Sequence, residues 1–133
     1  GFRNGDRIIQ LFADILQKHL PTEFFKGHIG GDDFFVCSKV DKVHYEKIKN
    51  IIDIFAAQAK TFYSKEDRKR GYIISHDREG KEKKFPMLNV SASVLFVNCD
   101  KKSKYTNHIN NILSLQKKIA KKDPNKLAAS CLL

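Results

Sequence analysis

A chain of 133 residues with 41% hydrophobic content is long enough for one ordinary core, so we expect a single domain. It has no uncharged apolar run of about 18 residues and no basic-then-apolar leader, which excludes a membrane span and export and predicts a soluble cytoplasmic protein. Its three cysteines have no C-x-x-C spacing, which argues against a disulfide framework and a zinc site.

The formal net charge is +10, from 25 Lys and Arg against 15 Asp and Glu. Such an excess attracts polyanions, including nucleic acid, phosphorylated ligands and acidic membrane surfaces. The cations are mostly lysines spread along the chain, which favours the simpler interpretation of a solvated surface.

Apolar residues recur at spacings of three and four over residues 7–20, which predicts a first helix ending near Pro21. Two short apolar runs then flank Gly-Gly-Asp-Asp at positions 30–33, as in a β-hairpin. The helical spacing returns over residues 43–62 and predicts a second, longer helix.

Residues 64–86 are rich in charge and predict a protruding hairpin. Residues 88–97 alternate at first and then become apolar on both faces, as expected of a central strand covered by helices. A third helix is predicted over residues 109–119, and residues 127–133 could form either a short last strand or a frayed tail.

The order helix, hairpin, helix, strand, helix predicts an α/β (α+β) fold with a central, mainly antiparallel sheet flanked by helices. Such a sheet normally has another strand before the first helix, whereas the chain begins almost at that helix. The sequence therefore predicts a domain incomplete at its N-terminus, with exposed strand edges that favour pairing with a second copy.

The Gly-Gly-Asp-Asp sequence has the residues that a nucleotide site needs. Gly30 and Gly31 allow positive φ and leave no Cβ between the backbone and a ligand. Asp32 and Asp33 could hold Mg²⁺, which bridges the phosphates of a nucleoside triphosphate. In a regular strand the two acids would point to opposite faces, so acting together requires a distorted pleat. A plain hairpin turn is the alternative.

Three segments resemble the GGDEF domain of bacterial diguanylate cyclases: G-F-R-N-G-D at 1–6, G-H-I-G-G-D-D-F-F-V at 27–36 and L-N-V-S-A-S-V at 88–94. Ala120-Lys121 is similar to the family's A-K motif. The resemblance covers nearly the whole of 1–133. It implies a nucleotidyl-cyclase-like fold lacking its first strand, GTP or cyclic di-GMP as ligand, Mg²⁺ or Mn²⁺ as cofactor, and a place in cyclic di-GMP signal transduction.

The resemblance implies a catalytic and metal-binding role for two residues. Asp32 would bind the metal. Asp33 stands where Glu is usual and would serve both the metal and the attacking 3′-hydroxyl, but it is one methylene shorter, which is expected to cost activity. The family's opening strand, with a further metal-binding aspartate, would precede Gly1, so this chain alone is expected to be inactive.

Substrate binding is implied for Asp6, Gly30, Gly31 and Lys121. Asp6 would contact guanine, although the residues themselves equally allow it to cap the first helix. Lys121 would contact the triphosphate, and the two glycines would let the backbone approach the nucleotide.

Other positions depart from the family's pattern. Asn125 stands where Arg is usual, with Lys126 beside it, which weakens or moves the phosphate contact. His28 also replaces a common arginine, and taken alone it is most simply a packed strand histidine. The family's inhibitory R-x-x-D site is replaced by P-T-E-F at 21–24, so product feedback there is not expected.

Three functions follow as hypotheses. The first is a regulatory domain that binds GTP and controls an attached partner, such as a phosphodiesterase domain. The second is an active diguanylate cyclase, a nucleotidyltransferase, in the full-length protein. The third takes the hairpin of residues 64–86 as a nucleic-acid or protein contact, although a solvated hairpin is simpler and we do not expect nucleic acid as the partner.

Overall fold

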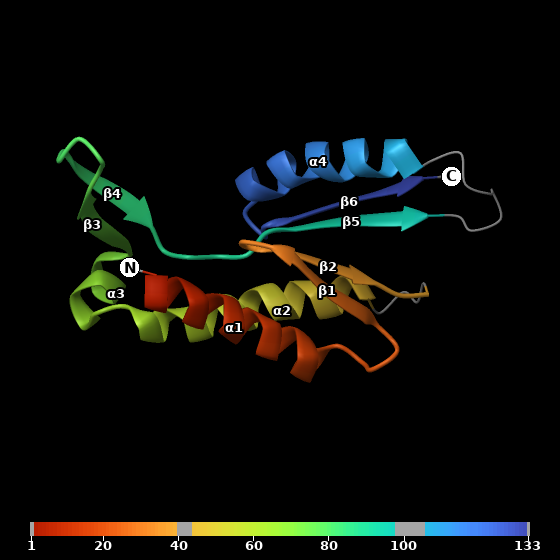
Figure 1. Ribbon diagram of the computed structural model, residues 1–133, viewed down its shortest axis with the longest axis horizontal. Coiled ribbons are helices and arrows are strands. Elements are labelled where there is room, and N and C mark those ends of the chain that lie inside the picture. The colour runs from red at the N-terminus through yellow and green to blue at the C-terminus, as the bar shows by residue number, and fades with distance from the viewer. Residues whose placement is uncertain (1, 40–43, 98–105, 133) are drawn as a thin grey trace.

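The computed structural model describes residues 2–39, 44–97 and 106–132 and has the predicted mixed α/β composition (Figure 1). Within these residues lie four α-helices, one 3₁₀ turn and six strands. The helices are α1 (Phe2–His19), α2 (His44–Ala59), α3 (Lys65–Arg70) and α4 (Thr106–Lys122), and the 3₁₀ turn η1 (Lys60–Phe62) follows α2. The strands are β1 (Phe25–Gly30), β2 (Asp33–Cys37), β3 (Tyr72–His76), β4 (Glu82–Pro86), β5 (Ala92–Val97) and β6 (Leu127–Leu132).

The six strands form three two-stranded sheets, so the single central sheet predicted from the sequence is not present among the described residues. β1 pairs with β2 and β3 with β4, both antiparallel, whereas β5 and β6 are parallel. No ladder of backbone hydrogen bonds joins the first of these pairs to the last, and each keeps an edge that no described strand covers.

The main core lies where α1 and α2 pack against the β1–β2 hairpin. The ring of Phe12 packs edge-on against two other rings: its centroid lies 4.9 Å from that of Phe34 in the hairpin and 5.4 Å from that of Phe55 in α2. Edge-on pairs add roughly 0.5–1.5 kcal/mol each beyond area burial, so Phe12 holds the hairpin to both helices. The buried members of this core are Ile15, Leu16, Leu20, Phe24, Ile51, Phe55 and Ala59.

The first helix is longer than the residues 7–20 that the apolar spacing predicted. α1 begins at Phe2 and ends at His19. Its end follows from Pro21, because the residue before a proline is disfavoured in helical backbone geometry. No helix of the described residues has the length and apolar content that crossing a membrane would require.

Of the two alternatives for residues 127–133, a short strand or a frayed tail, the structure has the strand: β6 pairs along its whole length with β5, and α4 connects the two. Gln116 fixes the helix to this pair of strands. This residue is 7% exposed, and its side-chain amide lies 3.1 Å from the Ser93 hydroxyl and within hydrogen-bonding reach of Ser130. The side of α4 that faces the strands is therefore set by a buried polar contact.

The charged segment 64–86 does protrude from the rest of the fold, as Figure 1 shows for α3, β3 and β4. The hairpin prediction was right for β3 and β4, but residues 65–70 form a helix instead. The Ser64 hydroxyl accepts from the Asp67 backbone N–H at 3.1 Å, and Gly71 ends the helix with φ 81°. A serine cap and a left-handed glycine are the ordinary start and stop of a helix.

Candidate functional site

The Gly-Gly-Asp-Asp sequence forms the end of the β1–β2 hairpin. Gly30 pairs with Asp33, so Gly31 and Asp32 make the loop. Gly30 has φ 149° and Gly31 has φ 55°, and a Cβ built on either would meet nothing within 4 Å. Glycine is therefore favoured here by backbone conformation and not by lack of space.

The pleat is distorted just before the turn. The register of the hairpin shifts between His28 and Gly30, which leaves Ile29 without a partner across the ladder. Such bulges change the direction in which the following side chains point. Asp32 and Asp33 are both exposed, so both carboxylates are accessible from solvent.

The Asp33 carboxylate is paired with a residue that sequence reasoning missed. Lys117 of α4 donates a hydrogen bond to Asp33 Oδ1 across 84 residues of sequence. This hydrogen bond and the positive charge of Lys117 hold the pKa of Asp33 below its ordinary value; burial opposes them, and the more weakly acting charge of Lys121 adds to the lowering.

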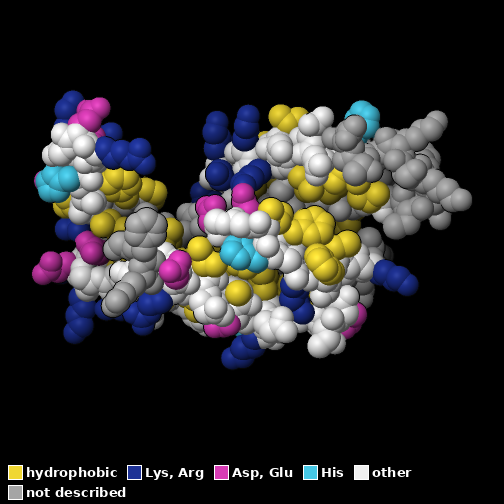
Figure 2. Space-filling model, viewed as in Figure 1, with side chains coloured by type: hydrophobic (Ala, Val, Ile, Leu, Met, Phe, Trp, Pro, Cys, Tyr) yellow, Lys and Arg dark blue, Asp and Glu magenta, His cyan; other side chains and the backbone are white. Residues whose placement is uncertain are grey.

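The signal that could have revealed Lys117 is its spacing from Lys121. Residues four apart on a helix lie on the same face, so the two ammonium groups belong to one side of α4. Figure 2 shows Lys and Arg side chains gathered over α4 directly beside acidic side chains at the tip of the hairpin. A carboxylate pair and a lysine-rich helix face thus meet on one surface.

His28 is exposed, and its ring lies against its own hairpin. Its ring stacks on Phe34 with centroids 4.5 Å apart and an interplanar angle of 16°. Its Nε2 lies 2.9 Å from the Gly31 carbonyl oxygen, so a proton on Nε2 would be donated to the loop. His28 therefore supports the shape of the turn.

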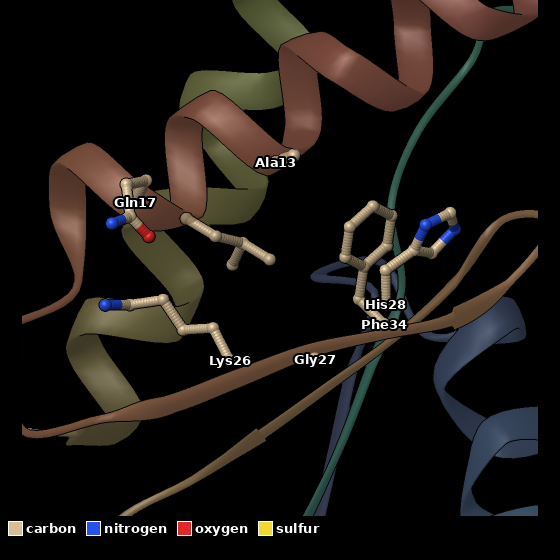
Figure 3. Close-up of a pocket in the computed structure, with 7 residues that line it drawn as sticks. Ala13, Gln17, Lys26, Gly27, His28 and Phe34 are labelled. Carbon is tan, nitrogen blue, oxygen red and sulfur yellow. The ribbon is translucent and has the colours of Figure 1, made fainter.

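A pocket of about 190 Å³ lies between α1 and the hairpin (Figure 3). Gln17 lines its helix side, and His28 and Phe34 line its hairpin side. Lys26 also lines it and donates from Nζ to the Pro21 carbonyl at 3.2 Å. The remaining lining residues are Ala13, Leu16 and Gly27.

Asp6 does not cap α1, because the helix begins four residues earlier at Phe2. The capping alternative is therefore wrong. Asp6 is exposed and precedes Ala13 and Gln17 by seven and eleven residues, which are about two and three helical turns. It thus belongs to the face of α1 that lines the pocket, about 10 Å along the helix from Ala13 at 1.5 Å per residue.

Two positions that the resemblance compares with phosphate-binding residues are Lys121, in α4, and Asn125, in the turn that follows the helix. Lys121 is exposed in the last turn. Asn125 is also exposed, and its backbone N–H donates to Asp123 Oδ2 at 2.8 Å. Lys126 Nζ donates to the Lys121 carbonyl at 2.7 Å, so this ammonium is engaged at the helix end.

The described residues contain no group of three or more His, Cys, Asp or Glu side chains placed to hold a metal. Asp32 and Asp33 are adjacent acids at an exposed turn. Mg²⁺ is commonly held by one or two carboxylates together with substrate phosphates and water, so this donor set fits a cation that arrives with a nucleotide.

The chain matches no family model, no curated protein and no solved structure. The geometry of the turn and of α4 therefore carries the functional argument. Of the predicted site residues, Gly30, Gly31, Asp32 and Asp33 lie together at the hairpin turn, and the charge of Lys121 acts on Asp33. Asp6 belongs to the pocket face of α1 but is not among the residues that line the pocket.

Proposed function

We propose that this chain is a GGDEF-type domain that binds GTP with Mg²⁺ and acts in cyclic di-GMP signalling as a regulatory unit. The supporting observation is the meeting of Asp33 with Lys117 beside Lys121. Carboxylates suited to a divalent cation and ammonium groups suited to phosphates lie on one exposed surface. A nucleoside triphosphate with its metal ion needs both kinds of group.

The proposal includes the arrangement of the strands. We propose that β1–β2 and β5–β6, with the helices packed against them, have the arrangement of a nucleotidyl-cyclase-like fold that lacks its first strand, without a strand ladder joining the two pairs among the described residues. Two contacts support this: α2 touches β5 as well as α1, and Val90, just before β5, packs against the main core.

Guanine selectivity is assigned to Asp6. A carboxylate can accept from both the N1–H and the exocyclic amine of guanine, and adenine does not offer this pair. Asp6 belongs to the α1 face that lines the pocket. Because the pocket volume is about 190 Å³, below the roughly 300–1,000 Å³ of sites that enclose a drug-sized ligand, it would take only part of the nucleotide.

The regulatory role follows from the residues that differ from the family's pattern. Asp33 is shorter than the usual Glu, and reacting groups tolerate little displacement. Asn125 brings no charge to the phosphates, and its backbone is held by Asp123. An active diguanylate cyclase is the second candidate, favoured by the exposure of both carboxylates at the turn.

The test is calorimetric titration of GTP in the presence of Mg²⁺, with ATP in parallel. We expect GTP to bind more tightly than ATP. Asp32→Asn should weaken Mg²⁺-dependent binding at least about tenfold, since even indirect support of a metal ligand is often worth 10–100-fold. Incubation of the full-length protein with GTP and Mg²⁺, followed by analysis for cyclic di-GMP, separates the regulatory role from the catalytic one.

The matched control is Asp53→Asn, which removes an exposed carboxylate from α2. This variant should bind GTP as the unchanged protein does. If Asp32→Asn keeps full Mg²⁺-dependent binding, or if GTP and ATP bind equally, the proposed nucleotide site is wrong. Formation of cyclic di-GMP would replace the regulatory role with the catalytic one.

A further inference from the structure

The contact between Lys117 and Asp33 joins two elements that are distant in sequence. Lys117 belongs to α4 and Asp33 begins β2. The two side chains are 47% and 51% exposed. Exposed ion pairs contribute little to stability, so this pair can open at little cost to the fold.

The base of the Lys117 side chain is nevertheless held in place. The preceding residue, Gln116, is buried and lies in hydrogen-bonding contact with Ser93 and Ser130. The backbone of α4 is therefore fixed over β5 and β6. A lysine ammonium on its flexible stem can then reach Asp33 or move away from it.

A divalent cation and the Lys117 ammonium would compete for the same carboxylate. Both are positive, and the hydrogen bond from Lys117 already occupies Asp33 Oδ1. Lys121 adds positive charge on the same side of the helix. A metal ion arriving alone meets this repulsion, whereas one arriving with a polyphosphate brings negative charge to which the ammonium can turn.

We propose that Lys117 is a charge-compensating residue that occupies Asp33 in place of a divalent cation and yields to the cation when a nucleoside polyphosphate binds. This rests on the proposed function. Lys117 thereby weakens binding of the bare metal and couples metal binding to nucleotide binding. Such coupling is reciprocal, so the metal favours the nucleotide by the same factor.

The test measures Mn²⁺ binding by electron paramagnetic resonance, first with Mn²⁺ alone and then with saturating GTP. Lys117→Met should bind Mn²⁺ alone about fivefold more tightly or better, the lower end of typical couplings between sites. The enhancement of Mn²⁺ binding by GTP should be smaller in this variant by a similar factor. Lys117→Arg keeps the charge and should behave as the unchanged protein does.

Lys118→Met is the matched control, because it removes the same charge from the next position, about 100° around the helix. It should leave both Mn²⁺ affinities nearly unchanged. If Lys117→Met and Lys118→Met bind Mn²⁺ alike, Lys117 does not compete at Asp33, and the proposed function still stands. Absence of Mn²⁺ binding by every form would overturn the inference as well.

The two proposals fail in different ways. If Lys117→Met tightens Mn²⁺ binding while GTP binds to no form, the competition at Asp33 is real but the nucleotide function is wrong. If GTP binds with Mg²⁺ while Lys117→Met changes nothing, the inference alone is wrong. Thermal unfolding of each variant, followed by circular dichroism, checks that the compared proteins are folded.

Discussion

Glycine is expected to have opposite effects on stability in the hairpin loop and inside α1. Gly31 lies in the loop with φ 55°, whereas Gly5 lies inside α1 without a positive φ. A Cβ added at either position would have nothing within 4 Å. Steric space is therefore equal at the two sites, and only backbone conformation distinguishes them.

We predict that Gly31→Ala destabilises the protein and Gly5→Ala stabilises it. Left-handed geometry costs a residue with a Cβ roughly 1–2 kcal/mol. In a helix interior, alanine is better than glycine by roughly 0.5–1 kcal/mol. Urea unfolding followed by circular dichroism measures both changes in the free energy of unfolding. Equal signs for the two variants would contradict this account of the turn.

At the residue scale, the sequence was sufficient to predict the hairpin turn but not the residue that pairs with Asp33. The two glycines and two acids are adjacent, so their local geometry could be predicted from turn chemistry. Lys117 could not, because its contact with Asp33 spans 84 residues and depends on how α4 is placed. Asp6 was read as a cap or a ligand, and only the observed start of α1 excluded the cap.

Among the elements, helices were predicted better than sheets. The second helix was predicted over residues 43–62, and α2 with η1 occupies His44 to Phe62. The spacing of apolar residues reports a helix locally. Strand partners are chosen by contacts distant in sequence, and so the single central sheet was wrong while the individual strands were largely right.

Several positive charges of the protruding segment, residues 64–86, have a partner within that segment. The guanidinium of Arg70 lies 5.3 Å from the centroid of the Tyr72 ring, and the ammonium of Lys84 lies 4.9 Å from it. Lys83 pairs with Asp77 at 3.0 Å. An aromatic ring that already contacts two cations offers little to a nucleic-acid base. This arrangement therefore favours a solvated hairpin over a nucleic-acid contact.

The attachment of α4 to β5 and β6 should depend on Gln116. Gln116→Ala should destabilise the protein by about 1–3 kcal/mol, because the hydroxyls of Ser93 and Ser130 lose a partner in a partly buried place. Ser114→Ala, at an exposed position of the same helix, should change the free energy of unfolding by less than about 0.5 kcal/mol. Chemical denaturation provides the comparison, and equal effects would show that Gln116 does not fix the helix.

For the molecule as a whole, the +10 charge does not by itself identify a ligand. What matters is where the cations lie relative to the turn. Ion pairs occupy several charges of the protruding hairpin, whereas Lys121 acts on Asp33 from α4. Charges farther apart than the Debye length of about 10 Å at 0.1 M salt are largely screened. Only the cations near the turn should therefore affect a bound nucleotide strongly.

This argument predicts different results for two triple variants that each remove three positive charges. The α4 variant replaces Lys117, Lys121 and Lys122 with Ala, and the hairpin variant replaces Lys81, Lys83 and Lys84 with Ala. The α4 variant should weaken GTP binding and reduce its dependence on salt, because ammonium groups near the turn are lost. The hairpin variant should bind GTP nearly as the unchanged protein does.

Titrations of GTP at 50 and 500 mM KCl, with uncharged guanosine as the control ligand, measure both effects at Debye lengths of roughly 14 and 4 Å. Equal weakening by the two variants would mean that net charge alone attracts the nucleotide and that α4 has no particular role.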